Sequence, residues 1–208
     1  MIFDMDGVLI DSNPLHADAW SVYLSQYGIS ADSILERMHG KRNDQIVRDL
    51  FGPKLTEAEV SAHGSAKEAL YRQRMRPYLE QSLVPGVRRF LQRYKDTPLA
   101  VASNAEPANV DFVLDEASLR PYFKAVVHGH QVRNPKPSPD IYLLAAGLLG
   151  VSPSRCVVFE DSTPGIEAAK SAGCRVVAVR TTDAELPETD HAIRDFTGPE
   201  LDTWLSGL

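Results

Sequence analysis

The sequence contains few cysteines, and this scarcity limits its redox and metal chemistry. Two of the 208 residues are cysteine, Cys156 and Cys174. Two separate thiols are too few for a disulfide framework or for a cysteine-based metal cluster. Each of them lies beside or within an apolar segment, so we expect both to be buried thiols.

The sequence also lacks an excess of positive charge and a long apolar run. It carries 22 lysine and arginine residues against 28 aspartate and glutamate residues, for a net charge of −6. General nucleic-acid binding depends on clustered positive charge, which this balance argues against. The longest apolar stretch, residues 142–151, is much shorter than the roughly 20 residues that a membrane helix requires. No signal peptide is evident, so we expect a cytoplasmic protein with no membrane or nucleic-acid partner.

The C-terminal two-thirds of the chain alternates short apolar runs with helical patterns. Strands without in–out alternation that are separated by helices indicate a parallel sheet covered on both faces. We therefore predict a doubly wound α/β core. The expected strands are residues 99–102, 125–128, 157–159 and 176–179, and the expected helices between them are residues 107–117, 139–149 and 165–172.

The segment near the N-terminus has a different, wholly helical pattern. It predicts an inserted α-helical cap at residues 13–83, with residues 1–12 and 84–208 forming the core. Thr56 and Glu59 have the spacing of a capping box at the start of the last cap helix. The strand before the cap would be only residues 2–5, so either it is short or a few native residues precede it. The expected cap helices are residues 15–27, 33–38, 44–51 and 56–78.

Asp4 and Asp6 lie two residues apart at the end of the first expected strand and are followed by Gly7. Side chains at positions i and i+2 of a strand point the same way, and α/β proteins bind ligands at the carboxyl ends of their strands. Both carboxylates can therefore reach one site at that edge of the sheet. Taken alone, the pair is equally compatible with solvated loop aspartates or a calcium loop.

Further polar groups follow three other expected strands. Glu160 and Asp161 form a second acidic cluster, and crowded carboxylates favour a hard divalent cation such as Mg²⁺. Ser103 and Asn104 supply a hydroxyl and an amide, and Lys136 lies between two prolines that stiffen its backbone. Each group alone has a structural explanation, as a helix cap or a solvated loop residue. Their shared position at successive strand ends favours a single site.

At this point the chain resembles the haloacid dehalogenase superfamily, and within it the helical-cap branch of β-phosphoglucomutases and sugar-phosphate phosphatases. The resemblance implies a Rossmann-like core and a magnesium-dependent enzyme that acts on a small-molecule phosphate ester. It extends from residue 3 to about residue 179. The motifs that carry it are FDMDGVLIDS at residues 3–12, ASN at 102–104, KPSPDIY at 136–142 and FEDSTPGI at 159–166.

The resemblance also implies a role for each matching residue. Asp4 would be the nucleophile that takes up the phosphoryl group, and Asp6 the general acid and then base. Ser103 would hold the transferring phosphoryl group beside Asn104, and Lys136 would neutralise charge on that group and on Asp4. Dehalogenases lack an acid at the position of Asp6, so its presence favours phosphate esters. The implied metal ligands are Asp4, the backbone carbonyl of Asp6, Asp161, and Glu160 through a metal-bound water.

The cap is expected to select the substrate. His16 and Trp20 are four residues apart on the first cap helix and therefore share a face. The mutases of the family have a similar histidine and tryptophan at this spacing from the nucleophile. A histidine with a role only in the core or on the surface is an equal alternative. Lys41 and Arg42 form a basic pair that would complete the substrate-binding set.

The loop around Gly40 departs from the mutase pattern and favours a phosphatase. The mutases of the family share a lysine just before this glycine and an arginine three residues after it. These two residues bind a second phosphate. The chain has His39 and Asn43 at those positions. A phosphatase needs only water at its second step, so phosphatase is the first hypothesis and phosphoglucomutase the second.

Two further hypotheses come from other functional classes. Receiver-type signalling modules also place acidic residues and a lysine at a sheet edge and hold a phospho-aspartate without turnover. They are usually smaller and have no helical insertion after the first strand. A catalytically silent binding protein is the other alternative, but all the motif residues are present. We expect the protein to be a monomer or a weak dimer.

Overall fold

The computed structural model describes residues 1–32, 34, 43–182 and 185–208. The chain forms two compact units. Residues Met1–Asp11 and Gln81–Leu208 make up the first, and residues Ser12–Glu80 make up the second. The sequence predicted that these boundaries fall after residues 12 and 83.

The first unit is built on a six-stranded sheet with the order β3-β2-β1-β4-β5-β6, and every neighbouring pair is parallel. This arrangement confirms the predicted doubly wound α/β fold. The short strand that precedes Asp4 lies in the middle of the sheet, between β2 and β4. The strands are β1 (Ile2–Phe3), β2 (Ala100–Ser103), β3 (Ala125–His128), β4 (Val157–Glu160), β5 (Arg175–Val179) and β6 (His191–Ile193).

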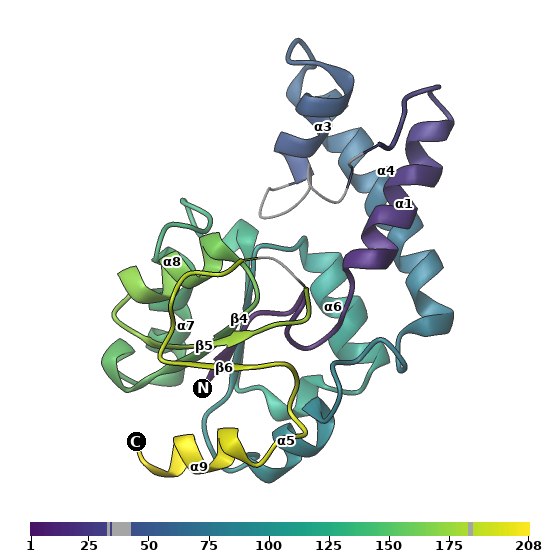
Figure 1. Cartoon of the computed structure of the whole chain (residues 1–208). Coiled ribbons are helices and arrows are strands. Elements are labelled where there is room, and N and C mark those ends of the chain that lie inside the picture. Colours follow the sequence, from purple (N-terminus) through teal and green to yellow (C-terminus); the bar gives the residue numbers. More distant parts are fainter. Residues whose placement is uncertain (33, 35–42, 183–184) are drawn as a thin grey trace. The chain divides into compact units, whose positions relative to one another are not determined.

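Alternate residues of the central strands pack on opposite faces of the sheet. On one face, Ile2, Val158 and Val176 join a buried cluster with α7 (Asp140–Leu149) and α8 (Thr163–Ser171) (Figure 1). Burial of these apolar side chains is the main favourable term for this layer. Because the strand residues alternate, their neighbours in sequence face the other layer.

The opposite face carries an aromatic cluster. The rings of Phe3 and Phe159 stack with centroids 4.6 Å apart, and Phe90 of α5 (Val87–Arg93) meets Phe3 edge-on at 6.2 Å. Such ring pairs add about 0.5–1.5 kcal/mol beyond the burial of their area. The neighbouring helix α6 (Pro107–Glu116) is joined to α5 through Arg88, which donates a hydrogen bond to the carbonyl after that helix (Figure 1).

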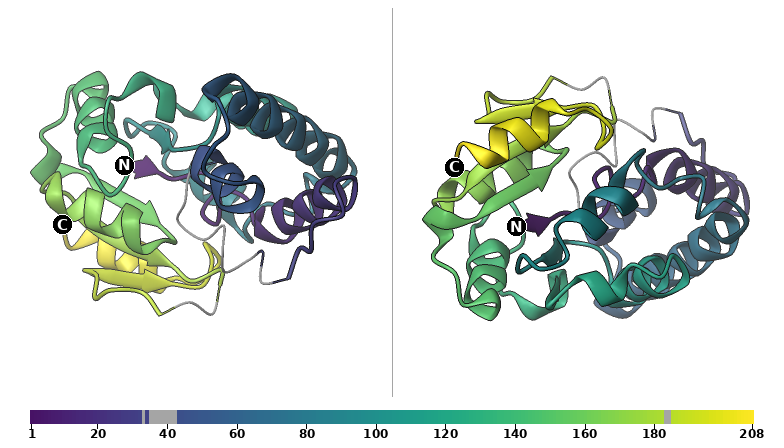
Figure 2. Two further views of the ribbon diagram at one scale, coloured as in Figure 1. Left: turned by 90° about the horizontal axis from the view of Figure 1, so that it is seen from above. Right: turned by 90° about the horizontal axis from the view of Figure 1, so that it is seen from below.

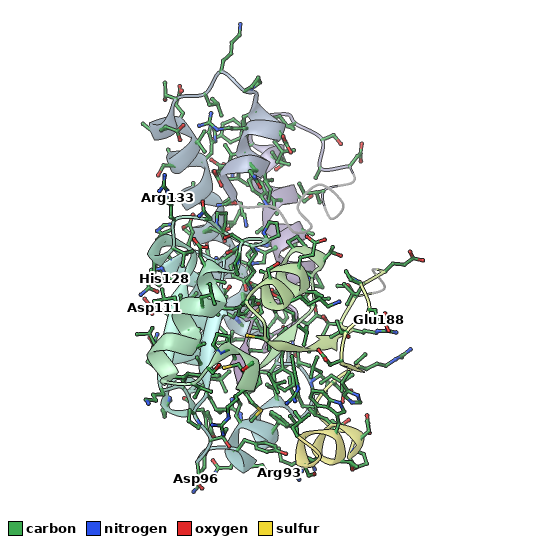
Figure 3. The ribbon with its side chains drawn as sticks, turned by 90° about the vertical axis from the view of Figure 1, so that its left-hand side faces the viewer. Arg93, Asp96, Asp111, His128, Arg133 and Glu188 are labelled. Atoms are coloured by element: carbon green, nitrogen blue, oxygen red, sulfur yellow. The ribbon has the colours of Figure 1, made fainter. Side chains whose placement is uncertain are left out.

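Three short elements of the first unit were missed by the sequence analysis. They are α5, β6 and α9 (Glu200–Ser206). None is longer than seven residues, so a periodic apolar pattern has little room to develop. Tertiary contacts hold them: Arg93 pairs with Asp202 of α9, and the hydroxyl of Tyr94 donates to the same carboxylate at 2.9 Å. Arg93 lies at the end of the core where α9 packs (Figure 3).

The first strand is shorter than the predicted residues 2–5, because the chain turns at Met5. The carbonyl of Met5 accepts hydrogen bonds from the amides of Leu9 and Ile10, at 2.9 and 3.2 Å. Asp4 still follows the line of the strand, since its amide donates to the carbonyl of Phe159 at 3.0 Å. The turn therefore begins just after the residue that the sequence marks as the nucleophile.

The second unit consists of α1 (Asn13–Ser25), α3 (Asn43–Phe51), α4 (Glu57–Met75) and the short 3₁₀ helix η1 (Arg76–Tyr78) in its described part. Helices α1 and α4 lie side by side in both views of Figure 2. The predicted capping box is confirmed: the amide of Thr56 donates to Glu59 at 2.8 Å, and the amide of Glu59 donates to the Thr56 hydroxyl at 3.3 Å. The helix expected at residues 33–38 falls outside the described residues except for residue 34.

The second unit has a hydrophobic cluster of its own, which includes Trp20, Leu24, Val47 and Val60. A separate cluster allows these helices to form a domain distinct from the sheet. Among the residues that the structure describes, no helix is both long enough and apolar enough to cross a bilayer.

Candidate active site

Three carboxylates meet where β1 and β4 end. Oxygen atoms of Asp4, Glu160 and Asp161 all lie within 4.8 Å of one another. The two strands are parallel neighbours, with Phe3 paired to Phe159, so the residues that follow them leave the sheet at the same edge. All three side chains are buried, with exposures of 7%, 0% and 6%. The structure thus brings together the two acidic clusters that the sequence marks separately.

Lys136 supplies the positive charge of this group. Its Nζ donates to Oδ1 of Asp4 and to Oε1 of Glu160, each at 2.6 Å, and to the carbonyl of Ala102 at 3.0 Å. It also lies 4.9 Å from the ring centroid of Tyr142. The contact with Asp4 was expected from the resemblance, whereas the contact with Glu160 was not. One ammonium group therefore ties the ends of β1, β2 and β4 together.

Hydrogen bonds hold both oxygens of Glu160. Oε1 accepts from Lys136 and from the hydroxyl of Tyr142 at 2.7 Å. Oε2 accepts from the amides of Asp161 and Ser162 at 2.9 and 3.1 Å, and from the Ser162 hydroxyl at 3.0 Å. Burial by itself would raise the pKa of Glu160, but Lys136 and the hydrogen bonds from Tyr142 and Ser162 together outweigh burial and lower it. Glu160 is therefore a fixed anion that faces Lys136.

The other two carboxylates behave in the opposite way. Burial raises the pKa of Asp4 to about 7; Lys136 opposes this rise, and the negative charges of Glu160 and Asp6 add to it. Burial, followed by the charges of Glu160 and Asp4, raises the pKa of Asp161 well above its usual value. Lys136 is more basic than an ordinary lysine because the two carboxylates outweigh its burial, which would lower its pKa. One lysine thus compensates only part of the negative charge at this edge.

Two glycines allow the backbone to approach these carboxylates. Gly7 has φ +73°, and a Cβ built on it would lie 1.9 Å from Oδ2 of Asp161. A Cβ on Gly165 would lie 1.8 Å from Oε1 of Glu160. No side chain larger than hydrogen fits at either position while the carboxylates stay where they are. The hydroxyl of Thr181, which the sequence analysis missed, donates to the carbonyl of Gly7 at 2.8 Å and holds this turn.

Three further predicted residues lie at the carboxyl edge of the sheet, namely Asp6, Ser103 and Asn104. The charge of Asp6 raises the pKa of both Asp4 and Asp161, which places it near them, but its carboxylate is not one of the three in close contact. Ser103 ends β2 and is 2% exposed; its hydroxyl oxygen accepts from the amide of Ala105 at 3.1 Å. The side-chain oxygen of Asn104 accepts from the amide of Lys136 at 3.4 Å. Asn104 therefore also helps to hold the lysine loop.

Tyr142 is a further site residue that sequence reasoning missed. It lies on α7, is fully buried, and donates its hydroxyl to Glu160. In the sequence it belongs to the apolar face of a core helix, where a tyrosine looks like any other packing residue. The sequence does place a tyrosine at an apolar position of this helix. Because a buried tyrosine hydroxyl usually has a hydrogen-bond partner, that position could have suggested a polar group nearby.

The cap residues His16 and Trp20 both lie on α1, as predicted. Nδ1 of His16 lies 3.0 Å from Nζ of Lys67 and 3.8 Å from Oε2 of Glu68, while Nζ of Lys67 donates to Oε1 of Glu68 at 2.6 Å. The ring of His16 stacks on Tyr71 with centroids 3.7 Å apart. Lys67 is 2% exposed and Glu68 is 5% exposed, so α4 buries an ion pair beside His16 that the sequence analysis did not anticipate.

Trp20 lies in the interior of the cap. Its side chain is 1% exposed and packs in the hydrophobic cluster of the cap, with Nζ of Lys67 5.0 Å from the ring centroid. The indole is large and apolar, so the cap gains more by packing it than by presenting it to a polar ligand. Lys41 and Arg42, the other predicted cap residues, lie outside the described residues, as does His39.

Comparisons with known proteins identify the family of the chain. The sequence model of the haloacid dehalogenase-like hydrolases matches residues 1–173. The chain belongs to this family. The family assignment confirms the resemblance drawn from the four motifs, and it makes the chain a hydrolase rather than a receiver-type module.

Individual members of the haloacid dehalogenase-like family cover most of the chain. The fructose-1-phosphate phosphatase YqaB of Escherichia coli is 36% identical, over 86% of this chain and 95% of that protein. A phosphorylated carbohydrates phosphatase of Thermotoga maritima is 38% identical, over 83% and 81%. The crystal structure of a β-phosphoglucomutase from Clostridium difficile superposes with a TM-score of 0.84 at 25% identity, over 98% and 94%.

The close approach of Gly7 to Asp161 leads to a first prediction. We expect Gly7→Ala to lower kcat/KM by at least about 100-fold, because its methyl group displaces a buried carboxylate of the site. The matched control is Gly150→Ala, which has φ +72° and no atom within 4 Å of the added Cβ. It should cost about 1–2 kcal/mol of stability, because alanine is strained at a positive φ, and it should leave kcat/KM unchanged. Equal activity of the two variants in steady-state assays would contradict this role for Gly7.

Proposed function

We propose that this hydrolase is a magnesium-dependent phosphatase that cleaves a small phosphate monoester, a sugar phosphate, through a phosphoryl group carried on Asp4. The observation that carries the proposal is the contact of Nζ of Lys136 with both Asp4 and Glu160. The contact keeps a buried carboxylate available for attack, and it adds positive charge where a phosphoryl group would arrive. The two phosphatases named above support the class of substrate.

The proposed chemistry assigns one task to each residue. Asp4 attacks phosphorus, and the bond to the leaving oxygen breaks. Lys136 stabilises the negative charge on the transferring group, and the hydroxyl of Ser103 with the amide of Asn104 donates hydrogen bonds to its oxygens. Asp6 protonates the leaving oxygen and then takes a proton from the water that hydrolyses the phospho-aspartate. For the first step its pKa must rise from about 3.9 toward neutrality.

The acidic group also fits Mg²⁺. Its donors are all carboxylate oxygens, and buried like charges that raise the pKa of Asp4 and Asp161 are relieved by a hard cation. We propose Asp4, Asp161 and the backbone carbonyl of Asp6 as the ligands. Glu160 already accepts hydrogen bonds on both oxygens, which suits an outer position. Bound magnesium supplies a Lewis acid that neutralises phosphate charge.

The second candidate function is a phosphosugar mutase of the β-phosphoglucomutase type. The structural likeness to the Clostridium difficile mutase favours it. A mutase must also grip a second phosphate, and His39 and Asn43 stand where the mutase pattern has a lysine and an arginine. We therefore place phosphatase first. We propose that Lys41 and Arg42 bind the charged part of the substrate. His16 belongs to the same proposed set of substrate-binding residues.

The proposal is tested with a panel of sugar phosphates and magnesium, with and without glucose 1,6-bisphosphate. We expect phosphate release that does not depend on the bisphosphate, and loss of release in Asp4→Asn, which keeps the shape but removes the nucleophile. The measurement is inorganic phosphate together with the isomeric state of the sugar. Isomerisation of β-glucose 1-phosphate that requires the bisphosphate would assign the mutase instead.

Magnesium binding should depend on pH, because the ligands must lose their protons. A carboxylate with a raised pKa is still protonated below that pKa, so protons compete with the metal at low pH. With the pKa of Asp4 at about 7, magnesium affinity should rise as the pH increases through about 7 and fall below it. Calorimetric titration in buffers of different ionisation enthalpy should detect proton release. The control is Asp161→Asn, in which we expect affinity to be lost; a heat independent of the buffer would contradict the prediction.

A further inference from the structure

The two cysteines lie side by side where β4 and β5 begin. Cys156 precedes β4 and Cys174 precedes β5, and the first pair of the parallel register is Val157 with Arg175. The amide of Arg175 donates to the carbonyl of Cys156 at 3.0 Å, which extends the ladder to the cysteines. Neighbouring strands lie about 4.7–4.9 Å apart, within the roughly 4.4–6.8 Å between Cα atoms that a disulfide spans.

Both thiols point to the same face of the sheet. Cys156 and Cys174 belong to the buried cluster that also contains Val158 and Val176, two positions further along each strand. Side chains two apart in a strand share a face, so the two thiols lie next to each other on the same face of the sheet. The thiol of Cys174 is close enough to Cys156 to lower the pKa of the Cys156 thiol.

The backbone around the pair is fixed on both sides. The amide of Cys156 donates to the carbonyl of Pro153 at 2.9 Å, and the amide of Cys174 donates to the carbonyl of Ala169 at 3.0 Å. The sulfurs can therefore approach one another by side-chain rotation while the two Cα atoms stay in place. Both cysteines are reduced in this structure, as the sequence analysis predicted for buried thiols.

The interaction between the two thiols also makes one more reactive than the other. Cys174 lowers the pKa of Cys156 to about 7, against the effect of burial, while the pKa of Cys174 is raised by Cys156 and by burial. Cys174 is 8% exposed and Cys156 is 1% exposed, so access is restricted to a small reagent. A peroxide of the size of water meets this requirement.

We propose that Cys156 and Cys174 form a peroxide-sensitive thiol pair that closes reversibly into an intramolecular disulfide. The pair sits at the amino edge of the sheet, whereas Glu160 and the other carboxylates sit at the carboxyl edge. The proposal is therefore independent of the proposed phosphatase function, and the two can fail separately.

The reaction balances with one peroxide molecule. The Cys156 thiolate attacks a peroxide oxygen, the O–O bond breaks, and the departing hydroxide takes up the thiol proton as water, which leaves a sulfenic acid on Cys156. The sulfur of Cys174 then attacks the sulfur of Cys156. The S–O bond breaks, and the second hydroxide leaves with the proton of Cys174 as water. Two thiols lose two electrons in total, and hydrogen peroxide gains them.

The test treats the full folded chain with hydrogen peroxide at neutral pH, then with catalase, and alkylates it with iodoacetamide after denaturation. We expect the alkylated thiols to fall from two per chain to none, with a mass loss of two hydrogens. Digestion should yield a peptide that joins Cys156 to Cys174, and dithiothreitol should restore both thiols. Because the sequence has only these two cysteines, the assignment is unambiguous.

Matched variants separate a paired reaction from two independent ones. In Cys174→Ala, Cys156 should gain oxygen instead of closing a bridge, and it should react at least about tenfold more slowly, because burial then holds its pKa above the roughly 8.5 of a free thiol. In Cys156→Ala, Cys174 should remain alkylatable. The proposal is overturned if the folded wild-type chain keeps two alkylatable thiols while the denatured chain oxidises. It is equally overturned by oxygen addition without a bridge, or by bridges between two chains only.

Discussion

The buried ammonium group of Lys136 is the constraint on which the site depends. It touches residues at the ends of three strands: Asp4 after β1, the carbonyl of Ala102 in β2, and Glu160 in β4. A buried charge is costly unless it is paired, and breaking one partner of such a pair typically costs about 3–5 kcal/mol. The proposed nucleophile is therefore positioned by an interaction that the fold cannot easily lose. Glu160 is essential to this arrangement, because its other hydrogen bonds fix where the lysine must point.

The charge imbalance around Lys136 connects the fold to the proposed chemistry. The lysine meets two carboxylates, and a third, Asp161, lies beside them against Gly7. The pKa values of Asp4 and Asp161 are raised for this reason together with their burial. Binding of a cation would offset the excess negative charge of such a site. A phosphoryl group would spread its own charge over several hydrogen-bond donors there. Raised pKa values at a buried cluster of this kind are typical of functional sites.

Much of this could be predicted from the sequence, and the remainder has physical causes. The parallel sheet followed from apolar runs without alternation, and the four motifs at strand ends identified the family correctly. The β6 strand and the helices α5 and α9 are too short for a periodic pattern and depend on tertiary contacts such as Arg93 with Asp202. Tyr142 and Lys67 were missed because a buried polar group in a helix is recognisable only once its partner is known. Helical spacing places His16 and Trp20 on a shared face, but it does not show that Trp20 packs in the hydrophobic cluster of the cap.

The claim that Asp4 carries the phosphoryl group can be tested directly. The enzyme is quenched with acid during turnover of a sugar phosphate, the acyl phosphate is reduced with borohydride, and the digested peptides are analysed by mass spectrometry. The account predicts that aspartate is converted to homoserine at position 4 alone, and that the conversion disappears in Asp4→Asn. Conversion at Asp6 or Asp161, or turnover with no trapped acyl phosphate at any aspartate, would contradict it.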